Sequence, residues 1–240
     1  MSGTPGKTPR TPCAGAPRRT VSRLVIDNRS SLLRDLVSAF VTLFVTIDPP
    51  GLAPIFLGVT AGLTRGERAQ IAMRASLTAF GVLLLFTVTG TAILEIFGIT
   101  IDAFRIAGGL LLFHIAFEMI FEKRQERHEK SAERAVTADH IRNIAIFPLA
   151  IPLVAGPGAI SATILLAGTF PTPLERLLLI LIVAINLAAA WLVFLAAERL
   201  DRLLGATGRI VLTRLLGLFL AALAVQFVID GVTAVLRAAV

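Results

Sequence analysis

The sequence Ile47-Asp48-Pro49-Pro50-Gly51-Leu52-Ala53-Pro54 lies in the middle of a long apolar run. A second stretch, Leu153-Val154-Ala155-Gly156-Pro157-Gly158-Ala159-Ile160-Ser161, interrupts another such run 107 positions later. Proline removes an amide donor and fixes φ, and glycine loosens the backbone, so each cluster predicts a break in a helix. In lipid, a broken helix is tolerated only where protein or a wet cavity satisfies the freed backbone groups.

The composition places these breaks in a membrane. The chain is 55% hydrophobic and 16% charged, against roughly 45–50% and 25% in soluble domains. Several apolar runs exceed the roughly 20 residues that cross a bilayer. The single cysteine, Cys13, excludes a disulfide framework and a cysteine metal site. The net charge of +7 does not indicate a nucleic-acid partner, because the basic residues lie in the N-terminal segment and between apolar runs.

We therefore expect an all-α polytopic protein with six transmembrane helices, of which the first and fourth are discontinuous. The expected spans are Leu36–Thr60, Ile71–Phe97, Ala103–Phe121, Asn143–Gly168, Leu177–Ala197 and Ile210–Ile229. The expected regions are a disordered basic tail (1–30), a first three-helix repeat (31–121), a charged cytoplasmic loop (122–142) and a second three-helix repeat (143–240). The tail could instead contact anionic lipid headgroups.

The two halves resemble each other. Pro50-Gly51 matches Pro157-Gly158 at an offset of 107, and Arg105-Ile106-Ala107-Gly108 matches Arg214-Leu215-Leu216-Gly217 at an offset of 109. Because each half has an odd number of spans, the second must enter the membrane from the opposite side. The repeat is therefore predicted to be inverted, and paired breaks in such repeats point to the binding site of a transporter.

The loops predict the orientation. Basic residues concentrate in the loops between spans 1 and 2, 3 and 4, and 5 and 6, and at the edges of those spans. This pattern predicts that these loops lie in the cytoplasm and both termini outside. These residues are Arg65, Arg68, Arg74, Lys123, Arg124, Arg127, Lys130, Arg134, Arg142, Arg199, Arg202 and Arg209, against Arg105, Arg176 and Arg237 on the other side. The charges of the N-terminal tail argue the other way.

Asp48 is the acid nearest the centre of a span, where a carboxylate is costly unless it is paired, hydrated or protonated. Two interpretations stay open: a site for a cation, a proton or a substrate ammonium group, and an N-cap for the second half-helix. The amides after Gly51 and Gly158 open half-helices and attract anions. The further candidate substrate-binding residues are Pro49, Pro54, Gly156, Pro157 and Ser161, and the candidate cavity-lining residues are Thr46, Thr163 and Asn186.

The alternatives for these residues are structural. The glycines and prolines could only kink the helices, and the threonine hydroxyls could bond back to their own helix carbonyls. Enzyme motifs such as G-x-S-x-G, H-E-x-x-H and the P-loop are missing from the sequence, so we expect neither a catalytic residue nor a metal site.

The chain resembles the MarC family of bacterial inner-membrane proteins. Phe44–Leu57 is similar to the family's Asn/Asp-Pro-x-Gly-x-x-Pro-x-Phe pattern, and Phe147–Ser161 is similar to its Pro-Leu-Ala-x-Pro-x-x-Ala-Gly-Pro-Gly-Ala-Ile-Ser stretch. The resemblance implies six spans in inverted repeats and broken helices around a central site. Some family members transport small neutral amino acids. Two positions depart from the family pattern, because many members have Asn where this chain has Asp48 and Leu52.

The favoured function is a secondary transporter of small neutral amino acids or similar zwitterions in the bacterial inner membrane, working by alternating access. No cofactor is expected apart from a coupling H⁺ or Na⁺, and the expected partners are a small-molecule substrate and the lipid bilayer. Gly158→Leu is predicted to abolish transport without unfolding the protein. The alternatives are a non-transporting membrane or sensory partner, and a cation or proton channel that uses Asp48.

Overall fold

The computed structural model describes residues 19–124, 128 and 145–238, with side chains from Leu32 onward. The chain divides into two units, residues 1–35 and residues 36–240, and each is described by itself. In the first unit the described backbone is helical from Arg19, so a helix begins inside the segment predicted to be a disordered tail. The predictions for residues 1–18, and for 125–127 and 129–142 of the charged loop, lie outside the described residues.

Every element in the described part of the chain is helical. The elements are α1 (Arg19–Ile47), α2 (Pro49–Val59), α3 (Arg65–Ile96), α4 (Ile101–Ile120), η1 (Ala145–Val154), α6 (Pro157–Thr169), α7 (Pro173–Leu195) and α8 (Ala197–Ala238). Five segments are long and apolar enough to cross a membrane, and η1 with α6 makes a sixth if the bent pair is one span. The prediction of an all-α polytopic membrane protein is confirmed.

Several helices begin earlier than the hydropathy predicts. Thr64 and Thr172 form capping boxes with Glu67 and Glu175, so α3 and α7 start in polar sequence before the apolar runs. Helix α8 also begins early, at Ala197, although the sixth span was predicted from Ile210. Its polar first part runs to Gly205, where a φ of 61° makes a kink that a glycine tolerates.

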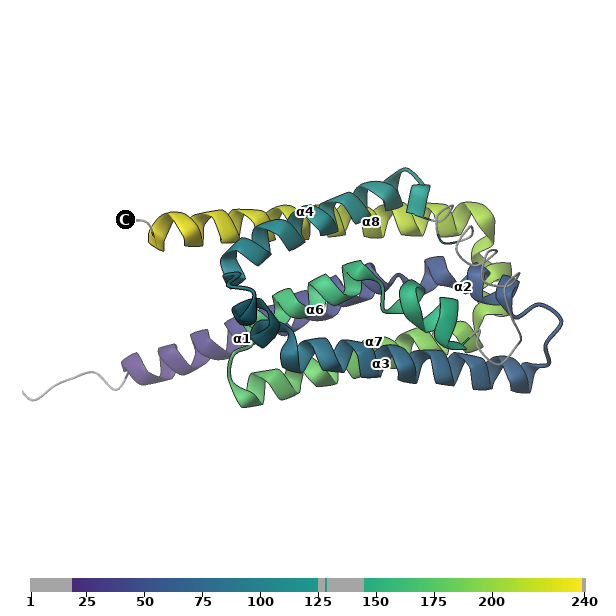
Figure 1. Cartoon of the computed structure of the whole chain (residues 1–240), viewed down its shortest axis with the longest axis horizontal. Helices are drawn as coiled ribbons and strands as arrows, with labels where there is room; N and C mark the ends of the chain where they lie inside the picture. Colours follow the sequence, from purple (N-terminus) through teal and green to yellow (C-terminus); the bar gives the residue numbers. More distant parts are fainter. Residues whose placement is uncertain (1–18, 125–127, 129–144, 239–240) are drawn as a thin grey trace, which may run out of the picture. The chain divides into compact units, whose positions relative to one another are not determined.

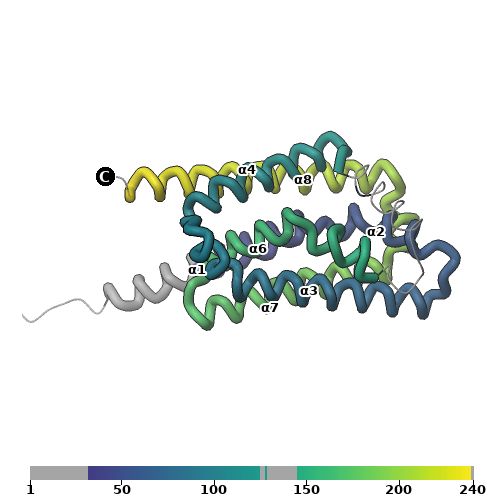
Figure 2. The backbone as a smooth tube through the Cα atoms, in the orientation of Figure 1, coloured from purple at the N-terminus to yellow at the C-terminus, as the bar shows by residue number. Residues whose placement is uncertain are grey.

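Helices from the two predicted repeats pack in equivalent pairs. Figures 1 and 2 show α4 running along α8 and α3 running along α7, and in each pair the chain runs in opposite directions. The broken helices cross over between the repeats, because α6 contacts α3 and α4 while α2 contacts α7 and α8. An inverted repeat, with a pseudo-two-fold axis in the membrane plane, would produce this exchange. The arrangement is therefore compatible with the predicted inverted repeat.

Small residues bring α4 and α8 together. A Cβ at Gly217 of α8 would lie 3.1 Å from the carbonyl oxygen of Ala116, and one at Gly109 of α4 would lie 2.9 Å from that of Ala224. Transmembrane helices associate closely where such residues let their backbones approach. Large apolar side chains such as Leu77 and Leu218 remain exposed on the outer faces, as expected of surfaces that contact lipid.

Candidate functional site

The first break is organised by Asp48, which lies between α1 and α2 in a left-handed conformation with φ 54° and ψ 59°. Aspartate is one of the few residues that adopt this conformation at small cost. Because Pro49 and Pro50 carry no amide hydrogen, Gly51 offers the first free amide of α2. That amide donates to Oδ1 of Asp48 over 3.2 Å, so the predicted N-cap is present in the structure.

The same prolines leave a carbonyl without its helical donor. In a regular helix the amide of residue 50 would donate to the carbonyl of Thr46, but Pro50 has none. Nη2 of Arg124 donates to this oxygen over 2.5 Å, and Nη1 of the same guanidinium donates to Sδ of Met119 over 3.2 Å. Arg124 is 7% exposed, and it therefore reaches from the end of α4 into the first break.

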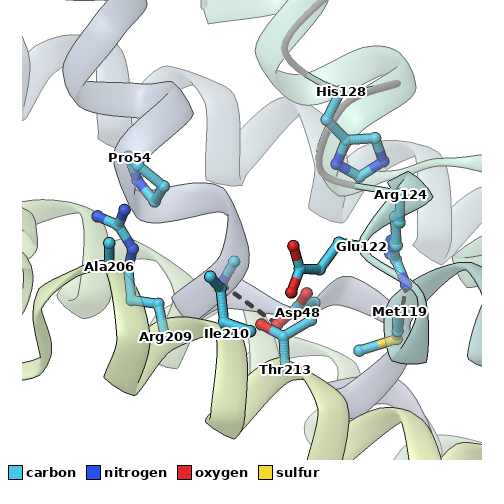
Figure 3. Close-up of a pocket in the computed structure, with 11 residues that line it drawn as sticks. Asp48, Pro54, Met119, Glu122, Arg124, His128, Ala206, Arg209, Ile210 and Thr213 are labelled. Atoms are coloured by element: carbon cyan, nitrogen blue, oxygen red, sulfur yellow. Dashed lines mark hydrogen bonds between the residues drawn. The ribbon is translucent and has the colours of Figure 1, made fainter.

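A cavity of about 280 Å³ adjoins Asp48 and Arg124. In Figure 3, Asp48 lies below Glu122, with Arg124 and Met119 to one side. The walls come from the start of α2, the end of α4 with the residues that follow it, and α8 beyond its kink at Gly205. The lining residues are Asp48, Gly51, Pro54, Met119, Glu122, Arg124, His128, Ala206, Arg209, Ile210 and Thr213.

Two of the charged lining residues are engaged by ion pairs at the rim. Glu122 accepts from Arg214 over 2.5 Å, and Arg209 pairs with Asp201. Asp48 and Arg124 differ from them because both are buried, with 4% and 7% of their surfaces exposed. A carboxylate and a guanidinium in one small cavity can hold the two ends of a zwitterion, since ionised groups form the stronger hydrogen bonds.

The second break has neither a charged cap nor a place in this cavity. Gly156 is the N-cap of α6 and provides no side-chain hydrogen bond, Pro157 follows it, and η1 and α6 meet at 57°. Gly158 is buried against α4: a Cβ there would lie 2.3 Å from Cδ1 of Ile115 and 3.3 Å from Cγ2 of Thr46. The two breaks therefore adjoin through Thr46, but the second is covered by packed side chains.

The predicted residues separate into three groups. Asp48, Gly51 and Pro54 line the cavity, whereas Pro49, Gly156, Pro157, Gly158 and Ser161 do not. The threonine hydroxyls bond back to their own helices, from Thr46 to the carbonyl of Thr42 and from Thr163 to that of Ala159. Asn186 donates to the Ile182 carbonyl within α7, and its Oδ1 is buried without a partner in the described part of the chain.

Sequence reasoning missed five lining residues that carry polar side chains: Glu122, Arg124, Arg209, His128 and Thr213. The first three were read as loop or interfacial charges. One signal for Arg124 was present, because Pro50 predicts an unsatisfied carbonyl at Thr46, but that signal does not name the donor. Among the residues that the structure describes, no group of three His, Cys, Asp or Glu side chains could hold a metal ion.

Comparisons with known proteins agree with this architecture. A family model described as MarC family integral membrane protein matches residues 33–236. A UPF0056 membrane protein of Archaeoglobus fulgidus is 40% identical over 81% of this chain and 90% of its own length. The UPF0056 membrane protein YhcE of Escherichia coli is 37% identical over 80% of this chain and 89% of its own length. No solved structure matches. The chain therefore belongs to the MarC family of integral membrane proteins.

Proposed function

We propose that this protein is a secondary transporter of small neutral amino acids or similar zwitterionic metabolites. The observation that supports the proposal is the pair of buried charges, Asp48 and Arg124, in one cavity beside a helix break. Charged groups inside spans are rare, and they mark substrate or ion pathways when they occur. In this proposal Asp48 binds the substrate ammonium group and Arg124 binds its carboxylate.

This assignment differs from the one that the sequence favoured for the carboxylate. Gly158 is packed against Ile115 and Thr46 and does not line the cavity, whereas Arg124 does. Arginine recognises a carboxylate through a planar set of donors. In the conformation that the structure describes, Arg124 is therefore the better candidate to bind the substrate carboxylate.

The size of the cavity favours a small substrate. Its volume of about 280 Å³ lies at the lower end of the roughly 300–1,000 Å³ usual for ligand pockets. Glycine and alanine carry both charges on very few atoms, so they are the first substrates to test. Asp48 is also the natural group to bind a coupling H⁺ or Na⁺ in this proposal.

The proposed location is the bacterial inner membrane, with both termini outside. The lining residues Ala206 and Arg209 belong to α8, whose first turn is joined to the first turn of α3 by the ion pair between Glu198 and Arg68. Basic residues mark the cytoplasmic side of a membrane protein. The cavity therefore faces the cytoplasm in this proposal, and alternating access would open the opposite edge at another stage.

The test is saturable uptake of radiolabelled glycine and alanine into proteoliposomes, with and without Na⁺ and at two pH values. Three competitors define the recognition: alanine carries both charges, propionate lacks the ammonium group, and alanine methyl ester lacks the carboxylate. We expect competition by unlabelled alanine alone among the three. Arg124→Gln should raise the KM for alanine more than it lowers the maximal rate.

Two results would contradict the proposal. Absence of saturable uptake for amino acids in every condition would remove the transport function. Equal competition by propionate, alanine and the methyl ester would keep a transport function but remove the recognition of a zwitterion by Asp48 and Arg124.

A further inference from the structure

A second cavity, of about 310 Å³, lies where α2 and α7 end and where α3 and α8 begin. It is separate from the cavity at Asp48, since the two have no lining residue in common. Its walls combine arginines with large apolar side chains. The lining residues are Phe56, Leu57, Arg65, Arg68, Ala69, Phe194, Leu195, Glu198, Arg199 and Arg202.

The charge of this second cavity is strongly positive, with four guanidinium groups against the carboxylate of Glu198. Glu198 already engages the two arginines of α3: its Oε1 lies 2.5 Å from Nη1 of Arg68, and its Oε2 lies 4.0 Å from Nη2 of Arg65. Nε of Arg68 also donates to the Thr60 carbonyl at the end of α2 over 3.2 Å. Arg68 is therefore held in place by Glu198 and by the end of α2.

Arg199 and Arg202 are placed differently. They lie three residues apart on the first part of α8, so they share one face of that helix. Both side chains are exposed, and neither has an acidic partner within the described residues. Two neighbouring guanidinium groups with free donors form the usual arrangement for binding a phosphate group.

The other half of the cavity is apolar and reaches the lipid-facing surface. Phe56 and Phe194 stack with their ring centroids 4.9 Å apart and close the inner side. Leu195 is 46% exposed, and Leu192, one turn earlier on α7, is 56% exposed. A ligand in this cavity would thus meet arginines at the membrane edge and an apolar helix face beside them.

We propose that this cavity binds the phosphate headgroup of an anionic membrane phospholipid, with Arg199 and Arg202 on the phosphate and an acyl chain along Leu192 and Leu195. Basic pockets between transmembrane helices are suited to such headgroups, and the anionic leaflet attracts arginines near its surface. The apolar wall favours a lipid over a soluble phosphate, because a soluble ion would leave that wall without a partner. This inference does not depend on the proposed transport function.

The experiment is native mass spectrometry of the full-length protein in detergent, titrated with phosphatidylglycerol, with phosphatidylcholine and with inorganic phosphate. The test variant is R199Q/R202Q. The matched control is R74Q/K123Q, which removes the same charge from two exposed residues outside both cavities. Gel filtration verifies that both variants remain folded.

We expect phosphatidylglycerol to bind the unaltered protein in preference to phosphatidylcholine. Each surface arginine contributes roughly a fivefold gain in binding, so R199Q/R202Q should weaken the complex about 30-fold. R74Q/K123Q should change it less than about threefold, because general surface charge acts weakly at a distance.

Three results would overturn the proposal. One is unchanged binding of phosphatidylglycerol in R199Q/R202Q, and another is an equal loss in R74Q/K123Q, which would assign the effect to surface charge in general. The third is binding of inorganic phosphate as strong as that of phosphatidylglycerol and lost in R199Q/R202Q, which would assign the cavity to a soluble phosphate.

Discussion

The first break is capped by the carboxylate of Asp48 and opens on a cavity, whereas the second is capped by Gly156 and lies under packed side chains. In both breaks the second half-helix begins with proline, and a glycine in its first turn lies close to a neighbouring side chain. Their neighbours differ, because Gly51 faces the Asp48 carboxylate while Gly158 faces Ile115 of α4. Similar sequence thus produces one charged, accessible break and one apolar, closed break.

This difference bears on how an inverted repeat would work. If the two breaks are related by symmetry, then in any one conformation one break is accessible while the other is covered. The closed state of the second break then depends on a few contacts with α4, above all the one between Gly158 and Ile115. Variants at the two breaks can test whether the inequality is functional or only structural.

The largest effect is expected at Asp48. Asp48→Asn should lower uptake by about 10- to 100-fold, because a hydrogen bond to a charged group contributes about 1.5–3 kcal/mol and each 1.4 kcal/mol is tenfold. Thermal stability in detergent should change little, since asparagine also caps helices and adopts the left-handed conformation. Asp102→Asn makes the same chemical change near the start of α4 and serves as the control. Wild-type uptake in Asp48→Asn would reduce Asp48 to a helix cap.

The second prediction concerns packing at the closed break. Gly158→Ala should destabilise the protein by about 1–3 kcal/mol, the usual cost of overpacking, because its Cβ would lie 2.3 Å from Cδ1 of Ile115. Ile115→Val removes that atom, so the double variant should recover part of the thermal stability lost in Gly158→Ala. If the stability losses of the two single variants add up in the double variant, the contact between residues 158 and 115 does not hold the second break closed.

The same contact changes the expectation for Gly158→Leu. The sequence predicts that this variant abolishes transport while the protein stays folded, but Gly158 has no room for a larger side chain beside Ile115 and Thr46. Loss of transport in Gly158→Leu would therefore report disturbed packing and not a lost anion site. Gly158→Ala combined with Ile115→Val is the cleaner test.

The third prediction applies the same substitution to the open break. A Cβ at Gly51 would lie 2.3 Å from Oδ2 of Asp48, so Gly51→Ala should displace the carboxylate and weaken the cap, at a cost of about 1 kcal/mol. Asp48→Gly removes the clash and keeps a residue that tolerates the left-handed conformation. In the double variant, thermal stability should recover relative to Gly51→Ala while uptake stays low. If both thermal stability and uptake recover in the double variant, transport does not require the charge of Asp48.

The sequence predicted the spans and breaks because their signals are local. Apolar runs of membrane length mark α3, α4 and α7, and prolines without amides mark the break at Asp48. The start of α8 was missed because residues 197–209 are polar, and hydropathy does not distinguish a polar helix from a loop.

Only the part of the candidate site that belongs to the first break was predicted from the sequence. Asp48, Gly51 and Pro54 line the cavity, but Arg124 follows α4 in sequence and was counted among the loop charges. Its burial depends on the reach of a long side chain toward an orphan carbonyl of another helix. The closure of Gly158 by Ile115 is likewise a tertiary contact, which the Pro-Gly motif cannot reveal.

The smallest effect is expected from Thr163→Val in the helix after the closed break. The hydroxyl of Thr163 donates to the Ala159 carbonyl of its own helix over 2.7 Å, and the residue does not line the cavity. Valine has nearly the same shape, so stability should change by less than about 0.5–1.5 kcal/mol, the net worth of one neutral hydrogen bond. Uptake should remain within about twofold of wild type, well below the tenfold change that 1.4 kcal/mol would produce. Thr42→Val, with an equivalent bond to Ser38 before the open break, is the matched control. A large loss of uptake in Thr163→Val alone would mean that the second break becomes accessible during the transport cycle and that its hydroxyl then meets the substrate.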